Sequence, residues 1–334
     1  MPEPTASIAY RVSVYPLQHV DGLDRWTSLR NLALEQAHVH PTPFSVPSFV
    51  EAFCAHQGLT CEIWLVADDT NDLAGLLVFK KKQGPFTRAI LPGFIPHSPF
   101  LYAGKTQPED AIMLLLNKLG KEFDDVRIHF PPFIDDARSF RWTGWQSSVF
   151  YTYQIDLAAY NVDRSSWSKA TRRNFQKHAS SYLFKEDASL TGHCISLCSD
   201  GYERNSRPFP INPQSLLNIC TDLQKKQMVR SFVVLKDEHA QPEAGIVVLQ
   251  DDKTAYYWIA GSLPGPAMTV LIGNVLEALK ESGLQTFDFV GANTPGIAEF
   301  KRRFGPTLVP YYGGWQTSNF LLDKMLKFRH LFSG

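Results

Sequence analysis

A short cationic helix that follows a strand has the clearest chemical content in this sequence. Thr294 and Pro295 predict where the helix begins, because threonine is a favoured N-cap residue and proline fits the first helical position. Gly305 predicts its end as a left-handed C-cap. The helix carries the basic run Lys301–Arg303, and the strand before it ends near Asp288. Because α/β folds place ligand sites just past such strand ends, the sequence predicts an anion-binding or reactive site here.

The same segment carries a family signature. Its pattern, D-F-x-G-x-N-x-x-G-I-x-x-F-K-x-x-F-G, resembles the C-terminal signature of Fem-type peptidoglycan aminoacyltransferases and of related tandem GNAT-like N-acyltransferases. In Fem-type enzymes the matching pair, here Phe300 and Lys301, lies where the acyl donor meets the amine. The resemblance implies that the Lys301 ammonium stabilises the oxyanion of acyl transfer and that Phe300 excludes water. The alternative is a surface lysine on an amphipathic helix.

Three nearby residues have less specific roles. Asp288 could orient Lys301 or the substrate amine, or it could bond to the backbone at the strand end. Asn293 could contact substrate or serve as a turn residue, and Tyr257 is assigned to the substrate side of the site. From a catalytic Lys301 we expect that Lys301→Ala abolishes activity without loss of folding.

A one-sided basic helix is predicted from Ser166 to about Ser180. Its basic residues share one face: Lys169, Arg172 and Arg173. Its larger apolar residues suit the opposite face: Trp167, Ala170 and Phe175. Such a helix can hold phosphate, a nucleotide, an anionic lipid or RNA, or it can simply be solvated. Fem-type proteins carry a similar basic helix at the start of their second domain, and this resemblance favours anion binding.

Tyr202, Arg204 and Arg207 lie in a stretch like the Y-E-R-x-x-x-P-x-P segment of related tandem acyltransferases. The two arginines could clamp a carboxylate or phosphate, and Tyr202 could position a substrate amine. The alternative is a helix end held by a surface Arg–Glu pair, which would contribute little energy.

A glycine-rich strand-to-helix junction could bind the phosphates of coenzyme A. Gly261, Ser262 and Gly265 stand where GNAT domains hold the pyrophosphate, since backbone N–H groups and the helix dipole favour anions there. The usual Q/R-x-x-G-x-G/A fingerprint is absent, and Pro264 and Pro266 each lack an N–H. An ordinary helix-capping loop is therefore the alternative.

Composition narrows the function classes. The chain has 334 residues, enough for two domains, and a formal net charge of zero at pH 7, which gives no global basic field for DNA. Its five cysteines are scattered without a second pair at zinc spacing, so we predict core thiols and no metal site. We see no signal peptide and no apolar run of about 18 residues, so we expect a cytoplasmic protein without a membrane span.

The two halves of the sequence repeat one order of elements. A pair of strand-like segments, 63–69 and 74–79, matches 232–238 and 244–249 at an offset of about 170 residues. A helix that begins at a proline precedes each pair, and a longer helix and a short strand follow it. This is the coarse order of an acyl-CoA N-acyltransferase (GNAT) domain.

We therefore predict an α/β (α+β) protein of two tandem GNAT-like domains, each a mixed twisted sheet flanked by helices. Residues 1–160 form the first domain, which lacks the lysine motif and is degenerate. Residues 161–334 form the second domain, which carries the active site.

The predicted function is transfer of an acyl group from an activated donor, with acyl-CoA favoured, to a primary amine of a small molecule or peptide. No general base stands out, so the substrate or a water would take the proton. One alternative is a Fem-type enzyme that uses aminoacyl-tRNA and a peptidoglycan precursor of the cell wall, although no long coiled-coil arm occurs. Another is a non-catalytic module that binds an anionic ligand.

Overall fold

The computed structural model describes residues 10–36, 39–104, 108–320, 322 and 324. The chain forms two compact units: the first runs to Val149 and resumes at Tyr311, and the second comprises Phe150–Pro310. These bounds differ from the expected division at residue 160. The chain passes between the units inside two long strands, so no change in composition marks the crossings.

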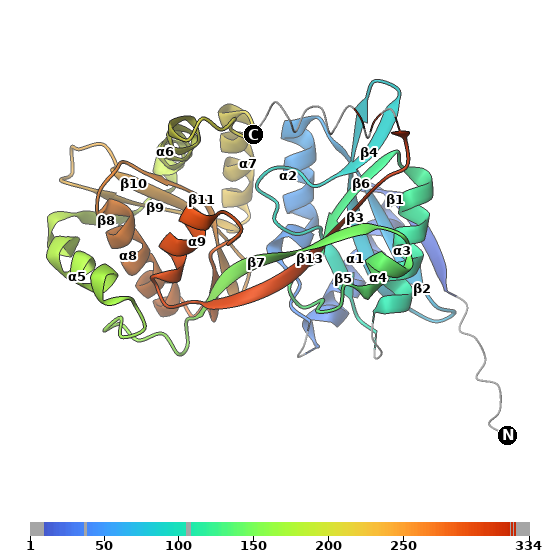
Figure 1. Ribbon diagram of the computed structural model, residues 1–334, viewed down its shortest axis with the longest axis horizontal. Coiled ribbons are helices and arrows are strands. Elements are labelled where there is room, and N and C mark those ends of the chain that lie inside the picture. The colour runs from blue at the N-terminus through green and yellow to red at the C-terminus, as the bar shows by residue number, and fades with distance from the viewer. Residues whose placement is uncertain (1–9, 37–38, 105–107, 321, 323, 325–334) are drawn as a thin grey trace. The chain divides into compact units, whose positions relative to one another are not determined.

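The first unit is a mixed sheet with helices on both faces (Figure 1). Its elements in chain order are β1 (Arg11–Pro16), α1 (Val20–Leu34), a 3₁₀ turn (Pro43–Ser45), α2 (Pro47–Gln57), β2 (Thr60–Ala67), β3 (Asp72–Gln83), β4 (Phe86–Ile90), β5 (Phe100–Tyr102), α3 (Glu109–Glu122), β6 (Asp125–His129), α4 (Arg138–Trp142) and the start of β7 (Gln146–Asp156). β1 to β4 pair antiparallel in sequence order, and β6 lies parallel to β4. The sheet is continued by β13 (Thr307–Thr317), antiparallel to β6.

The second unit has the same plan. Its elements are α5 (Lys169–His178), β8 (Leu183–Glu186), α6 (Thr191–Arg204), α7 (Pro213–Lys225), β9 (Val229–Leu235), β10 (Ala244–Gln250), β11 (Thr254–Ser262), α8 (Ala267–Glu281), β12 (Thr286–Asp288) and α9 (Pro295–Arg302), with 3₁₀ turns at Ala179–Ser181 and Ala188–Leu190. β8 to β11 pair antiparallel, β12 lies parallel to β11, and β7 continues the sheet beside β12. α6 and α7 cover one face, and α8 with α5 covers the other (Figure 1).

The predicted repeat is confirmed in this pairing. Each unit has four antiparallel strands, then a strand parallel to the fourth, with a helix before that parallel strand. Each sheet also takes a strand from the opposite half of the sequence, since β13 serves the first unit and β7 the second. Both helices expected to begin at a proline do so, at Pro47 and Pro213.

α8 is the central helix of the second unit's core and fixes the position of α5. A Cβ atom at Gly273 of α8 would lie 2.3 Å from the Phe175 ring, so glycine allows α5 to pack closely. The buried face of α5 is Thr171 and Phe175, one turn apart. Ala170 is exposed, so its predicted place on the apolar face was wrong, and Trp167 is buried just before the helix begins.

All five cysteines are free and buried, which confirms the prediction of core thiols. Within the described ranges, the longest apolar helices are too short or too polar to cross a membrane.

Candidate active site

Two parallel strands separate in the second unit and leave a junction at their carboxyl ends. β11 pairs with β12 only through Thr254–Tyr256 and Thr286–Asp288. β11 then continues to Ser262 and carries a bulge opposite β10, which bends the strand. The chain after Asp288 instead turns away toward α9. Such a divergence beside a helix N-terminus is a favoured place for a ligand in α/β folds.

The N-terminus of α8 has no hydrogen bond from a capping side chain among the described residues. Of the residues that the structure describes, none caps this end with a side chain, and Pro266 supplies only its carbonyl to the N–H groups of Thr269 and Val270. The N–H groups of Ala267 and Met268 have no partner within a helix. Together with the helix dipole, they form an environment suited to a phosphate.

The three loop residues predicted to bind the cofactor have different environments. A Cβ atom at Gly261 would lie 2.2 Å from the backbone of Leu197, so this glycine allows α6 to pack against β11. Ser262 is half-buried, and its carbonyl accepts a 2.6 Å hydrogen bond from Nη2 of Arg204. Gly265 has φ 139°, a conformation that needs glycine, and open space surrounds its Cα. Gly265 is therefore the loop glycine with room for a ligand beside it.

Lys301 is buried, with only 4% of its surface exposed. Its Nζ donates to the carbonyl oxygens of Phe289 at 2.6 Å, Val290 at 3.0 Å and Gly291 at 2.8 Å. An ammonium has three hydrogens, so all three are used. Burial lowers the pKa of Lys301 to about 8, and the charge of Asp288 opposes that shift. Nζ also lies 5.2 Å from the centroid of the Tyr257 ring.

Asp288 is buried and fully hydrogen-bonded. One carboxylate oxygen accepts from the Thr152 hydroxyl at 2.5 Å and from the Val290 N–H at 2.7 Å, and the other accepts from the Gln154 amide at 2.9 Å. Burial raises the pKa of Asp288, while these bonds and the Lys301 charge oppose the rise. Thr152 and Gln154 belong to β7, more than 130 residues earlier in sequence, and sequence reasoning missed both because no local pattern links them to Asp288.

The turn between Asp288 and α9 has an unusual backbone. Val290 has φ 52° and Gly291 has φ 83°. A β-branched residue with positive φ costs about 1–2 kcal/mol, so the surrounding bonds must maintain this conformation. The N–H of Gly291 donates to the Thr152 hydroxyl at 3.2 Å, which adds to the bonds from Asp288 and Lys301.

α9, the helix of the family signature, begins as predicted, with Thr294 as N-cap and Pro295 at the first position. The Thr294 hydroxyl makes no cap hydrogen bond. The helix ends at Arg302, before the predicted end at Gly305. Gly305 nevertheless has φ 73°, and a Cβ atom there would lie 2.3 Å from the carbonyl oxygen of Ser166.

Two aromatic candidates lie against this turn. Tyr257 is half-buried, 5.8 Å from the Phe289 ring, and its hydroxyl lies 3.6 Å from Sδ of Met268 on α8. Phe300 is half-buried and packs edge-on against Phe304 at 5.2 Å. The structure therefore brings Lys301, Tyr257 and the start of α8 together.

The remaining candidates lie elsewhere. The Asn293 side chain pairs with the backbone N–H and carbonyl of Tyr151 at 2.8 and 3.2 Å, as a strand residue would. Tyr202 packs edge-on against Phe209, and the exposed Arg207 donates its N–H to the Tyr202 carbonyl. Within this group, Arg204 contacts the loop before α8 through the carbonyl of Ser262.

The basic residues of α5 remain available to solvent. Lys169 and Arg173 are exposed, and Arg172 is half-buried. The ion pairs found in the described parts of the chain include none of the three.

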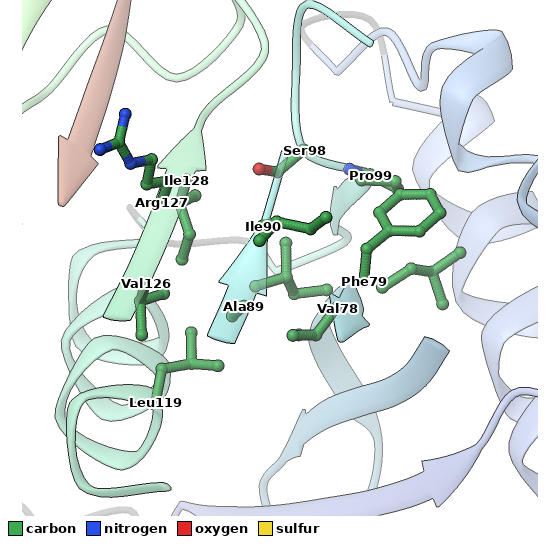
Figure 2. Close-up of a pocket in the computed structure, with 12 residues that line it drawn as sticks. Val78, Phe79, Ala89, Ile90, Ser98, Pro99, Leu119, Val126, Arg127 and Ile128 are labelled. Atoms are coloured by element: carbon green, nitrogen blue, oxygen red, sulfur yellow. The ribbon is translucent and has the colours of Figure 1, made fainter. Parts of the chain in front are cut away.

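In the first unit, the parallel strands that correspond to β11 and β12 are β4 and β6, and the segment at residues 98–99 closes the junction beside them. β4 ends at Ile90, and β5 resumes pairing with β3 at Phe100. Between them, the Pro99 carbonyl accepts from Leu77 at 3.0 Å, and the Ser98 N–H donates to the His129 carbonyl at 2.7 Å. Residues 98–99 therefore bridge β3 and β6. Figure 2 shows the small pocket that remains, lined by apolar side chains of β3, β4, β6 and α3 together with Ser98, Pro99 and Arg127.

Residues 163–302 match the acetyltransferase (GNAT) domain family. Among solved structures, FemX has a TM-score of 0.65 at 13% identity, with 90% of this chain and 96% of FemX covered. A tandem GNAT protein from the clavulanic acid biosynthesis pathway has a TM-score of 0.57 at 12% identity, with 92% and 99% covered. L-PGS from Bacillus licheniformis has a TM-score of 0.56 at 13% identity, with 90% and 100% covered. No curated protein sequence matches this chain.

The family match spans most of the second unit, and the structural matches span nearly the whole chain, which confirms the predicted α/β fold with tandem GNAT-like domains. Residues 163–302 therefore form a domain that matches the acetyltransferase (GNAT) family, and the chain as a whole shares the fold of FemX and of the tandem GNAT protein.

Proposed function

We propose that this protein transfers an acyl group from an acyl-CoA thioester to a primary amine, and that the second unit carries the reaction. The observation that carries this proposal is the uncapped N-terminus of α8 beside the point where β11 and β12 separate. The family match to a GNAT domain over the same residues supports a coenzyme A donor. The closed junction of the first unit supports assignment of the chemistry to the second.

In this proposal the donor's phosphates bind the N–H groups of Ala267 and Met268, next to Ser262 and Gly265. The thioester then extends along β11 toward Tyr257. The exposed basic face of α5 (Lys169, Arg172 and Arg173) holds a further phosphate of the donor or acceptor.

The amine nitrogen attacks the thioester carbonyl carbon, and a C–N bond forms as the carbonyl oxygen becomes an oxyanion. Collapse of this tetrahedral species breaks the C–S bond and releases the thiol. Because its three hydrogens are already bound, Lys301 acts through its positive charge in a site with little water rather than through a direct hydrogen bond. Phe300 forms part of the wall that limits water.

The amine proton leaves to water or to the departing thiolate. Asp288 does not take it in this proposal, because both carboxylate oxygens already accept hydrogen bonds and only 1% of the residue is exposed. Arg204, Arg207 and Tyr202 are proposed to contact the acceptor, with Arg204 placed at the loop before α8. The Asn293 side chain connects the turn to the backbone of Tyr151 on β7.

A second candidate is aminoacyl transfer from tRNA to a peptidoglycan precursor, and the solvent-accessible basic residues of α5 favour it. That face suits a polyanion as well as it suits the phosphates of coenzyme A.

The test mixes purified protein with acetyl-CoA or a long-chain acyl-CoA and a panel of primary amines, and follows free thiol and acylated amine by mass spectrometry. We expect amine-dependent release of thiol in equal amount to acylated product. Saturable donor binding without such release would contradict catalysis and indicate a binding module. Failure to bind every acyl-CoA would contradict the proposed donor and turn attention to aminoacyl-tRNA.

A further inference from the structure

The Val290–Gly291 turn is held from two sides. On its N–H side, Val290 donates to Asp288 at 2.7 Å and Gly291 donates to the Thr152 hydroxyl at 3.2 Å. On its carbonyl side, Val290 and Gly291 both accept from Lys301, at 3.0 and 2.8 Å. Since both turn residues have positive φ, the turn depends on these bonds for its shape.

Thr152 connects both N–H bonds of the turn to one strand, β7. Its hydroxyl donates to Asp288 at 2.5 Å while accepting from the N–H of Gly291. Gln154, two residues along β7 on the same face, donates to the second Asp288 oxygen at 2.9 Å. Both carboxylate oxygens are thereby oriented, and the oxygen that receives the Val290 N–H cannot rotate away.

The position of the Lys301 charge follows from this arrangement. A lysine side chain is long and usually extends its ammonium to water. Here Lys301 is 4% exposed and its ammonium has three backbone carbonyls as acceptors, all from residues 289–291. If the turn relaxed, those carbonyls would separate and the ammonium would no longer be held 5.2 Å from the Tyr257 ring.

We propose that Thr152 and Gln154 of β7 are positioning residues for acyl transfer: they fix Asp288, Asp288 fixes the left-handed turn, and the turn carbonyls hold the Lys301 ammonium at the reacting carbonyl. The kinetic part rests on the proposed function, and the turn itself does not. A strand encoded in the first half of the sequence thus completes the site of the second unit.

The test compares Thr152→Val, which removes the hydroxyl and keeps the shape, with Thr152→Ser, which keeps the hydroxyl. Thr286→Val on the neighbouring β12 is the matched control, since Thr286 is half-buried and lies outside this network. Gln154→Leu is a second variant at a more exposed position, in case Thr152→Val does not fold. Hydrogen–deuterium exchange of the peptide that covers residues 289–292 is measured for each, together with kcat and KM for acyl-CoA.

We expect amide exchange at 289–292 to accelerate in Thr152→Val and Gln154→Leu and to stay at the wild-type rate in Thr152→Ser and Thr286→Val. We expect kcat to fall on the order of 10–100-fold in the first two variants, with KM for the donor within about twofold, because a misplaced group costs rate rather than binding. Unchanged exchange in both variants would overturn the proposal. If the wild-type protein acylates no amine, the proposed function fails, and the exchange comparison alone still decides whether Thr152 and Gln154 hold the turn.

Discussion

Nζ of Lys301 on α9 donates a 2.8 Å hydrogen bond to the carbonyl oxygen of Gly291, ten residues earlier in the turn that follows β12. The same ammonium bonds the carbonyls of Phe289 and Val290. A residue that sequence alone assigns to chemistry is therefore also a support of the backbone around it. Any change at Lys301 must be judged on stability as well as on activity.

Lys301→Met should destabilise the protein. The change leaves three carbonyls without donors, those of the buried Phe289 and of the half-buried Val290 and Gly291. Each buried group without a partner costs about 1–3 kcal/mol, offset in part because a buried charge is removed. We expect the free energy of unfolding to fall by about 2 kcal/mol or more, measured by urea denaturation. The exposed Lys226→Met on the α7 C-cap is the control and should change it by less than about 0.5 kcal/mol. A wild-type urea midpoint for Lys301→Met would show that the three bonds contribute nothing.

Gly261→Ala should disrupt packing rather than only ligand binding. The new Cβ would lie 2.2 Å from the backbone of Leu197, so α6 would have to move away from β11. We expect a loss of about 2–4 kcal/mol in a thermal or urea melt. Gly296→Ala provides the contrast, because open space surrounds that position in α9 and its φ is negative; it should be neutral or stabilising by about 0.5 kcal/mol. Equal melting of the two variants would refute the packing role of Gly261.

His97 should make the protein acid-sensitive. It is 1% exposed, both ring nitrogens are without a hydrogen-bond partner among the described residues, and Tyr311 and Phe44 pack against its ring. Burial lowers its pKa from 6.5 to about 3, with a further contribution from His129. The unfolded chain therefore takes up this proton below pH 6.5 while the folded protein does not, so the free energy of unfolding falls as pH drops from 6.5 toward 3.

His97→Leu should remove about 2 kcal/mol of the stability difference between pH 7 and pH 5. The measurement is the urea midpoint across that pH range, with the exposed His239→Asn as control. If the urea midpoint of His97→Leu falls between pH 7 and pH 5 as steeply as that of the wild type, groups other than His97 cause the acid sensitivity.

The basic face of α5 is expected to bind anions without contributing to folding. Lys169→Glu combined with Arg173→Glu should leave the free energy of unfolding within about 0.5 kcal/mol, since both side chains are exposed. Affinity for acyl-CoA should fall about tenfold, with weaker dependence on salt. Reversal of the same number of charges at Lys225 and Lys226 on α7 controls for net charge. Unchanged affinity would leave α5 as a solvated cationic face.

The elements of the fold were predictable where the signal is local. Pro47, Pro213 and Pro295 each mark a helix start, because proline suits the first helical position. The two hairpins were predictable because similar apolar runs, each pair separated by a polar turn, recur at a shared offset. The boundary between the units was not, because β7 and β13 look like ordinary strands in sequence and only the pairing shows which sheet each one joins.

The site was predictable only in part, for the same reason. The motif identifies Lys301 and Asp288, but it does not contain their partners. Thr152 stands 136 residues before Asp288, and only tertiary structure joins them. Burial of Lys301 was equally hidden, since lysine is a residue type that is almost never fully buried.

The most direct test of the central claim is an isothermal titration of acetyl-CoA into the wild-type protein, Pro266→Asn and Pro266→Asp. Position 266 precedes the first residue of α8, so aspartate there places a negative charge where we assign the donor phosphates. We predict saturable binding to the wild type, similar affinity for Pro266→Asn, and affinity weaker by about tenfold or more for Pro266→Asp. Equal affinity of all three proteins would contradict a phosphate site at the start of α8, and no binding to any of them would contradict acyl-CoA as the donor.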